Sequence, residues 1–243
     1  MSLNYPVSIQ GFIHVACMGR YQEIADELFH CVIHSGLAAK SKVNVIKLGT
    51  GKLDVPEEFN LLLTDDDLTR YEYPTLRLAW EFSQNNDAHV WYIHSKGVSK
   101  IPETWEEEKR FWEQRCNYPS SFKAMSQNCY EWRKFMSYFI LNRYRDCLRE
   151  LNHSDACGVA YRSQPMPHFS GNFWWANTEY LRTLPDPETL RNLMIDENGR
   201  DRYMAEFWIG YKNPVVKDLF PHKHNIYLWG INPAAYRPLQ TFL

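Results

Sequence analysis

The sequence predicts an α/β protein, in which a mostly parallel sheet is flanked by helices and the 243 residues form a single domain. Two observations lead to this prediction. Short runs rich in Val, Ile and aromatic residues, which are typical of strands, alternate with segments whose apolar residues recur at helical spacing. The first three segments have the order strand, helix, strand, and this order is typical of a parallel sheet.

The N-terminal elements follow one another closely. Residues 7–17 are rich in Val, Ile and Phe and predict the first strand, and residues 20–34 predict a helix that ends at Gly36. Residues 43–48 and 59–64 predict the second and third strands. A sheet therefore begins within the first quarter of the chain.

A second helix and a buried strand complete this half. Pro74 suits a first helical turn, and Leu76, Ala79 and Trp80 then mark one face of a helix. The helix leads into residues 90–93, which predict a buried strand. We expect residues of about 7–100 to form the nucleotide-binding half of the domain.

The remaining half, about residues 101–243, is richer in helical patterns. A capping box at Thr104 predicts a charged helix to about residue 115. Residues 122–151 carry the longest apolar periodicity and predict either one helix or two with a break near Asn142. The later elements are a short strand at 157–161, helices at 178–184, 187–195 and 202–209, and an irregular tail from residue 212.

Composition excludes several classes of protein. The formal net charge is -2 and the sequence pI is about 6.5, so no basic footprint for nucleic acid is present. No apolar run approaches the ~18 residues of a transmembrane segment, and the N-terminus lacks the apolar core of a signal peptide. The 6 Cys form no C-x-x-C pair, so we interpret them as small buried hydrophobic residues of a reducing compartment. We expect a cytoplasmic protein without a transmembrane segment.

Two stretches combine polar and aromatic groups in a way that indicates a binding site. The buried strand at 90–93 ends abruptly in His94, Ser95, Lys96 and Gly97, and ligands of open α/β sheets bind beyond the carboxyl ends of strands. The second stretch spans residues 168–175. It joins directional polar groups, which suit sugar hydroxyls, to broad aromatic faces, which suit the C–H side of a sugar ring. Its candidate sugar- and acceptor-binding residues are His168, Asn172, Trp174 and Trp175.

The order of elements, the strand ending Tyr-Ile-His-Ser-Lys-Gly and the later His-Phe-Ser-Gly-Asn-Phe-Trp-Trp resemble the GT-A class of nucleotide-sugar glycosyltransferases, whose fold is Rossmann-related. The likeness is greatest to small members from bacterial and viral glycan-building systems, and it covers about residues 7–210. It implies transfer of a sugar from a UDP- or GDP-sugar to a hydroxyl acceptor, expected to be a carbohydrate, as in polysaccharide biosynthesis.

The resemblance implies a metal-binding Asp-x-Asp after the fourth strand, but this chain has His94, Ser95 and Lys96 there. A diphosphate leaving group needs a nearby cation. Lys96 can supply that charge, assisted by His94, so a requirement for Mn²⁺ or Mg²⁺ is doubtful. Asp65 and Asp67 remain a reserve metal site, although they come one strand too early.

A transferase of the inverting kind also needs a base for the acceptor hydroxyl. Glu206 is the candidate, because it is an acid among apolar residues in a predicted helix, and Asp201 is the alternative. Arg70 and Arg77 are candidate donor contacts. Two other functions remain open: a non-catalytic sugar-binding module on a degenerate transferase fold, and a nucleotidyltransferase.

Overall fold

A computed structural model describes residues 7–100, 119–193 and 201–237. The elements of the first half are strands and helices in alternation. They are β1 (Ser8–Ala16), α1 (Tyr21–His34), β2 (Lys42–Leu48), β3 (Asn60–Asp65), the 3-10 turn η1 (Leu68–Arg70), α2 (Tyr73–Asn85), β4 (Ala88–His94) and the 3-10 turn η2 (Val98–Lys100). The predicted strands and helices of this half are confirmed, with bounds that differ by a few residues. The charged helix predicted at 104–115 lies outside the described residues.

The second half is more helical, and its strands are short. Its elements are α4 (Pro119–Ser137), the π-helical turn η3 (Tyr138–Asn142), α5 (Tyr144–Glu150), β5 (Ala156–Gly158), β6 (Tyr161–Arg162), β7 (His168–Phe169), β8 (Trp174–Asn177), α6 (Thr178–Thr183), α7 (Pro187–Leu193), α8 (Asp201–Phe207), η4 (Trp208–Gly210), β9 (Val216–Asp218), α9 (Ile226–Trp229) and η5 (Pro233–Ala235). The long periodic pattern is therefore broken at Arg143, directly after Asn142, as one of the two predicted alternatives, a break near Asn142, had it.

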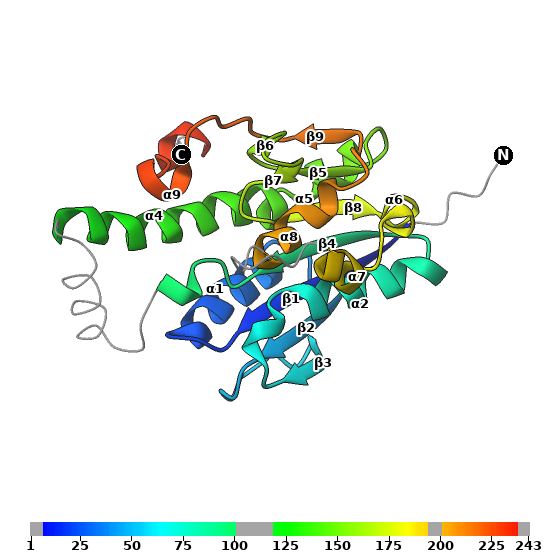
Figure 1. Ribbon diagram of the computed structural model, residues 1–243, viewed down its shortest axis with the longest axis horizontal. Coiled ribbons are helices and arrows are strands. Elements are labelled where there is room, and N and C mark those ends of the chain that lie inside the picture. The colour runs from blue at the N-terminus through cyan, green and yellow to red at the C-terminus, as the bar shows by residue number, and fades with distance from the viewer. Residues whose placement is uncertain (1–6, 101–118, 194–200, 238–243) are drawn as a thin grey trace.

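The larger sheet has seven strands in the order β3-β2-β1-β4-β8-β5-β9. β1 pairs in parallel with both β2 and β4, and β2 pairs in parallel with β3. β8 lies antiparallel between β4 and β5, and β9 is parallel to β5. Figure 1 shows this sheet from β3 at the bottom to β9 at the top. The prediction of a mostly parallel sheet flanked by helices is confirmed, and the arrangement is compatible with a Rossmann-like fold.

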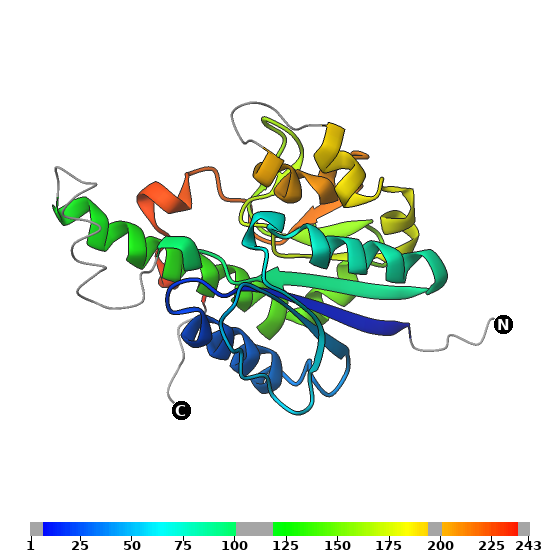
Figure 2. The same ribbon diagram turned by 60° about the horizontal axis from the view of Figure 1, so that its bottom comes forward.

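Two apolar cores cover the two faces of the sheet. Alternation along β4 sends Trp91 and Ile93 into the core that includes α1, whereas Tyr92 packs into the core that includes α2. Figure 2 shows α1 and α2 on opposite sides of the sheet. Gly11 of β1 leaves room for the Trp91 ring, because a Cβ atom at Gly11 would lie 2.1 Å from that ring. The sheet is thus buried on both faces, as a parallel sheet requires.

The C-terminal tail differs from the prediction. Residues from 212 onward were expected to be irregular, yet β9 joins the edge of the sheet and α9 packs against α4. β9 has only three residues, and its register with β5 is set by the fold and not by an apolar pattern. Three of the five described cysteines, Cys129, Cys147 and Cys157, are buried as predicted.

Candidate functional site

A cleft of about 1050 Å³ lies at the carboxyl ends of the parallel strands. Ala16 ends β1, Leu48 ends β2 and His94 ends β4, and all three line the cleft. Residues following η1, residues of the β6–β7 connection and residues of α8 complete its walls. The cleft is therefore where the carboxyl edge of an α/β sheet places a ligand.

Lys96 and Glu206, which are 110 residues apart, form an ion pair in this cleft. The Lys96 Nζ lies 2.9 Å from Glu206 Oε1 and 4.8 Å from the centroid of the Trp132 ring. The Arg133 guanidinium donates to the Lys96 carbonyl at 3.0 Å and so fixes the turn that follows β4. Burial lowers the pKa of Lys96, but the carboxylate of Glu206 outweighs it, so the pKa lies above its ordinary value. Lys96 is charged, and Glu206 already balances that charge.

Glu72 and His94 form a second charged group in the cleft. The His94 Nδ1 lies 3.2 Å from Glu72 Oε1, and the other ring nitrogen lies 2.9 Å from the Gly171 carbonyl oxygen. Burial lowers the pKa of His94, although Glu72 opposes this effect. Because both nitrogens of His94 face protein oxygens, its ring is not directed at a ligand.

His14 lies beside His94 in the paired strands β1 and β4. Its Nδ1 lies 2.8 Å from the Thr75 hydroxyl oxygen. Burial lowers the pKa of His14 to about 4, so the ring is neutral near pH 7. Neither His14 nor Glu72 was predicted as a site residue. The sequence does contain one indication of this site: His14 is a polar residue near the carboxyl end of an apolar strand.

Three residues of the 168–175 stretch are buried and so are not placed for the direct ligand contact that was predicted. Trp174 and Trp175 are fully buried, because β8 is a central strand and their rings pack against Tyr92 and Trp91 of β4. The side chain of Asn172 is also buried. Its amide nitrogen donates to Glu72, and its amide oxygen accepts from the Trp174 ring nitrogen. The assignment of these three residues to direct sugar contact is wrong for this reason.

His168 does reach the cleft. Its Nδ1 lies 2.7 Å from the Met166 carbonyl oxygen, and its ring lies 5.0 Å from the ring of Phe207. These contacts orient the ring at the cleft wall, where His168 and the neighbouring Ser170 both line the cavity. His168 is the one sugar-binding candidate of this stretch that lies there.

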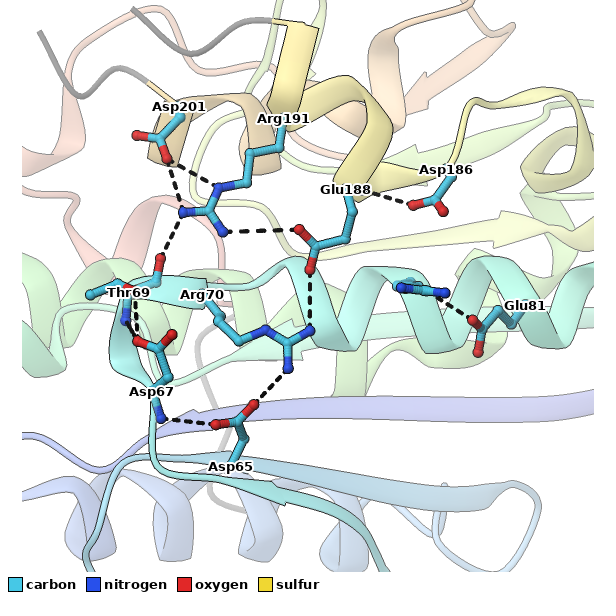
Figure 3. A network of polar contacts seen from close by, with 10 residues as sticks. Asp65, Asp67, Thr69, Arg70, Glu81, Asp186, Glu188, Arg191 and Asp201 are labelled. Atoms are coloured by element: carbon cyan, nitrogen blue, oxygen red, sulfur yellow. Dashed lines mark hydrogen bonds and ion pairs between the residues drawn. The ribbon is translucent and has the colours of Figure 1, made fainter. Parts of the chain in front are cut away.

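Asp65, Asp67 and Arg70 belong to a polar network that joins the end of β3 to α7 and α8 (Figure 3). The Arg70 guanidinium lies 2.6 Å from Asp65 Oδ2 and 3.3 Å from Glu188 Oε1. Asp67 Oδ1 accepts from the backbone N–H of Thr69 and so caps η1. Backbone and guanidinium donors hold the pKa of Asp65 below its ordinary value.

Arg191 of α7 belongs to the same network. Its guanidinium lies 3.1 Å from Asp201 Oδ2 and donates to the Thr69 carbonyl oxygen at 2.9 Å. Asp201 is therefore a structural partner and does not replace Glu206 as the candidate base. Arg77 lies elsewhere on α2, where it pairs with Glu81 at 2.9 Å on the surface. Neither Arg70 nor Arg77 lines the cleft.

The carboxylates of Asp65 and Asp67 have the partners of turn-capping groups and not those of metal ligands. Across the described ranges, no group of three or more His, Cys, Asp and Glu side chains is arranged to hold a metal ion. In this structure Asp65 is engaged by Arg70 and Asp67 by the backbone of Thr69, and their role as a reserve metal site stays a prediction.

The outer wall of the cleft is basic. Arg162, Arg202 and Lys223 all line it. Arg162 donates to the carbonyl oxygens of Lys223 and His224 at 2.7 and 2.8 Å, which ties the C-terminal tail to β6. Burial, together with the positive charge of this region, lowers the pKa of the nearby His222. The wall thus carries positive charge that is separate from the Lys96–Glu206 pair.

No helix in the described part of the chain has the length and apolar character needed to cross a membrane. No curated protein matches the sequence. One family model, described as a domain of unknown function (DUF8361), matches residues 55–218, which is more than half of the chain. The match includes β3, α2, β4, β8 and α8, and with them Glu72, His94, Lys96 and Glu206. The chain therefore belongs to the DUF8361 family.

Proposed function

We propose that this protein is a nucleotide-sugar glycosyltransferase of the GT-A type, which moves a sugar from a nucleoside diphosphate donor to a hydroxyl group of a carbohydrate acceptor. The observation that carries the proposal is the Lys96–Glu206 pair inside the cleft at the carboxyl edge of the sheet. A transferase of this kind needs a cation near the departing diphosphate and a base near the acceptor hydroxyl. The pair supplies one of each.

The volume and charge of the cleft support a large anionic donor. Its volume of about 1050 Å³ lies at the upper end of the usual range for small-molecule sites. Arg162, Arg202 and Lys223 add positive charge along one wall, which suits a diphosphate. Leu48, Leu68 and Tyr71 line another part of the cleft and offer an apolar and aromatic surface for the nucleoside.

The ion pair suggests how the two groups act in sequence. A diphosphate that approaches Lys96 competes with Glu206 for the ammonium group, so donor binding releases the carboxylate. Glu206 then accepts the proton of the acceptor hydroxyl as the acceptor oxygen bonds to the anomeric carbon. The bond from that carbon to the diphosphate breaks, and its electron pair leaves with the diphosphate, whose charge Lys96 stabilises.

Lys96 in this role makes a divalent metal dispensable. A UDP- or GDP-sugar is the donor class that we would test first, and Mn²⁺ or Mg²⁺ is an alternative source of the charge. Donor binding that persists in EDTA supports the lysine, whereas donor binding that requires Mn²⁺ contradicts it.

A thermal-shift panel tests the function itself. The probes are UDP-, GDP-, CMP- and dTDP-sugars, the four nucleoside triphosphates, and free monosaccharides. Stabilisation by one nucleotide sugar, with release of its nucleotide when oligosaccharide acceptors are added, is the expected result. Stabilisation by free sugars alone would instead indicate a sugar-binding module. Stabilisation by nucleoside triphosphates alone would indicate a nucleotidyltransferase.

A further inference from the structure

Glu72 is a carboxylate that three different parts of the chain hold in the cleft. It lies between η1 and α2, it lines the cleft, and 17% of its side chain is exposed. Tyr92 of β4 and Asn172, which precedes β8, both donate to its Oε2, at 2.9 and 2.6 Å. His94 lies 3.2 Å from its Oε1. A glutamate that is merely exposed to solvent at the N-terminus of a helix has no such set of partners.

The two oxygens of Glu72 differ in what they have left to offer. Each carboxylate oxygen has two lone-pair directions. The two donors to Oε2 occupy both of its directions. Within the part of the chain that the structure describes, Oε1 faces only His94. Oε1 therefore retains the capacity to accept one more hydrogen bond, and the cleft is the space that adjoins this side chain.

The surrounding charges keep this carboxylate ionised. Burial raises the pKa of Glu72, but the neighbouring His94 and Lys96 and the hydrogen bond from Asn172 outweigh it, so the pKa lies below its ordinary value. Tyr92 stays protonated, since burial and the charge of Glu72 raise its pKa well above the ordinary value. The acidic group that faces the same region is Glu206 of α8, which Lys96 balances. Glu72 is thus a rigid acceptor and a poor proton donor.

We propose that Glu72 binds a hydroxyl group of the transferred sugar, which donates a hydrogen bond to Oε1. His94, Tyr92 and Asn172 act as positioning residues that hold the carboxylate in place. This inference rests on the proposed function, because it takes a sugar as the ligand. The inference also gives the buried Asn172 a role. Its amide orients Glu72, so Asn172 does not need to be exposed in the cleft itself.

The test compares Glu72→Gln with the wild type and with Glu81→Gln, a matched substitution on the exposed face of α2. In Glu72→Gln the amide oxygen still accepts from Tyr92 and Asn172, and the amide nitrogen replaces Oε1 beside His94. The variant keeps the shape of the side chain but presents a donor where the wild type presents an acceptor.

The probes are UDP-glucose, UDP-galactose and GDP-mannose, each measured by calorimetry beside UDP or GDP. The dissociation constant of the nucleotide, divided by that of its nucleotide sugar, gives a ratio that reports the contribution of the sugar alone. We expect Glu72→Gln to reduce that ratio about tenfold to hundredfold, as expected for loss of a hydrogen bond to a charged group, and to leave UDP or GDP affinity unchanged. Glu81→Gln should change neither.

Tyr92→Phe provides a second and milder test, because the ring remains packed on Trp174 while one donor to Glu72 is lost. Loss of that donor raises the pKa of Glu72. The sugar contribution should therefore weaken at a higher pH in Tyr92→Phe than in the wild type. If Glu72→Gln does not fold, an unchanged pH dependence in Tyr92→Phe refutes the inference.

The outcomes separate this inference from the proposed function. If nucleotide sugars bind and Glu72→Gln leaves the sugar contribution unchanged, the inference fails and the function stands. If only free glucose, galactose or mannose binds, and Glu72→Gln abolishes that binding, the proposed function fails and no sugar is transferred, while Glu72 remains the group that binds a sugar hydroxyl. If none of these probes binds the wild type, both fail.

Discussion

The buried His14 makes the stability of this protein depend on pH in a way that a single substitution can isolate. Burial lowers the pKa of His14 to about 4, whereas an unfolded chain has the ordinary value of 6.5. Between these values the unfolded chain binds a proton that the folded chain does not. The free energy of unfolding therefore falls as the pH falls from about 6.5 towards about 4.

The magnitude follows from the same two values. One pKa unit corresponds to about 1.4 kcal/mol, so the full effect approaches ~3 kcal/mol below pH 4. Between pH 7.5 and pH 5.0, His14 alone should lower the free energy of unfolding by about 2 kcal/mol. His14 is 3% exposed, so solvent screening does little to reduce this value.

The assay is urea unfolding of the wild type and His14→Gln at pH 7.5 and pH 5.0. Glutamine does not titrate, and its amide retains a hydrogen-bonding group near Thr75. The substitution has its own cost at both pH values, so the comparison concerns the change between them. We expect His14→Gln to lose about 2 kcal/mol less than the wild type on acidification.

The matched control is His153→Gln, because His153 is exposed in the turn after α5. This control should lose as much stability on acidification as the wild type. If His14→Gln and the wild type lose equal amounts, His14 is not a neutral buried group, and the charge balance that we infer for Glu72 and His94 is wrong as well.

Three further predictions concern packing and charge. Gly11→Ala should lower the free energy of unfolding by about 1–3 kcal/mol in urea, because the new methyl group meets the Trp91 ring; a neutral effect would contradict the packing between β1 and β4. Arg133→Met should cost about 3–5 kcal/mol, since it leaves Glu27 without the guanidinium that lies 2.7 Å away; stability equal to that of the wild type would refute this. Lys96→Ala should weaken nucleotide-sugar binding about tenfold to hundredfold in EDTA, measured by calorimetry; full affinity in this variant together with complete loss of wild-type binding in EDTA would favour a metal.

Local sequence patterns were sufficient for the parallel part of the sheet. The apolar runs of β1, β2 and β4 and the helical periodicity of α1 and α2 predicted those elements, because each is buried on a continuous face. The same patterns located His94 and Lys96 at the end of a strand. The carboxyl ends of parallel strands meet at one edge, so the position of the cleft followed from the topology.

The tertiary structure alone decided which polar groups meet and which aromatic rings are exposed. Trp174 and Trp175 suited sugar binding by residue type, but the insertion of β8 between β4 and β5 buries both rings. Glu72 reads as an ordinary residue before a helix, and only the fold brings Tyr92, His94 and Asn172 around it. A sequence pattern records which face of an element is buried, whereas hydrogen bonds between residues 20 to 110 positions apart depend on strand order and register.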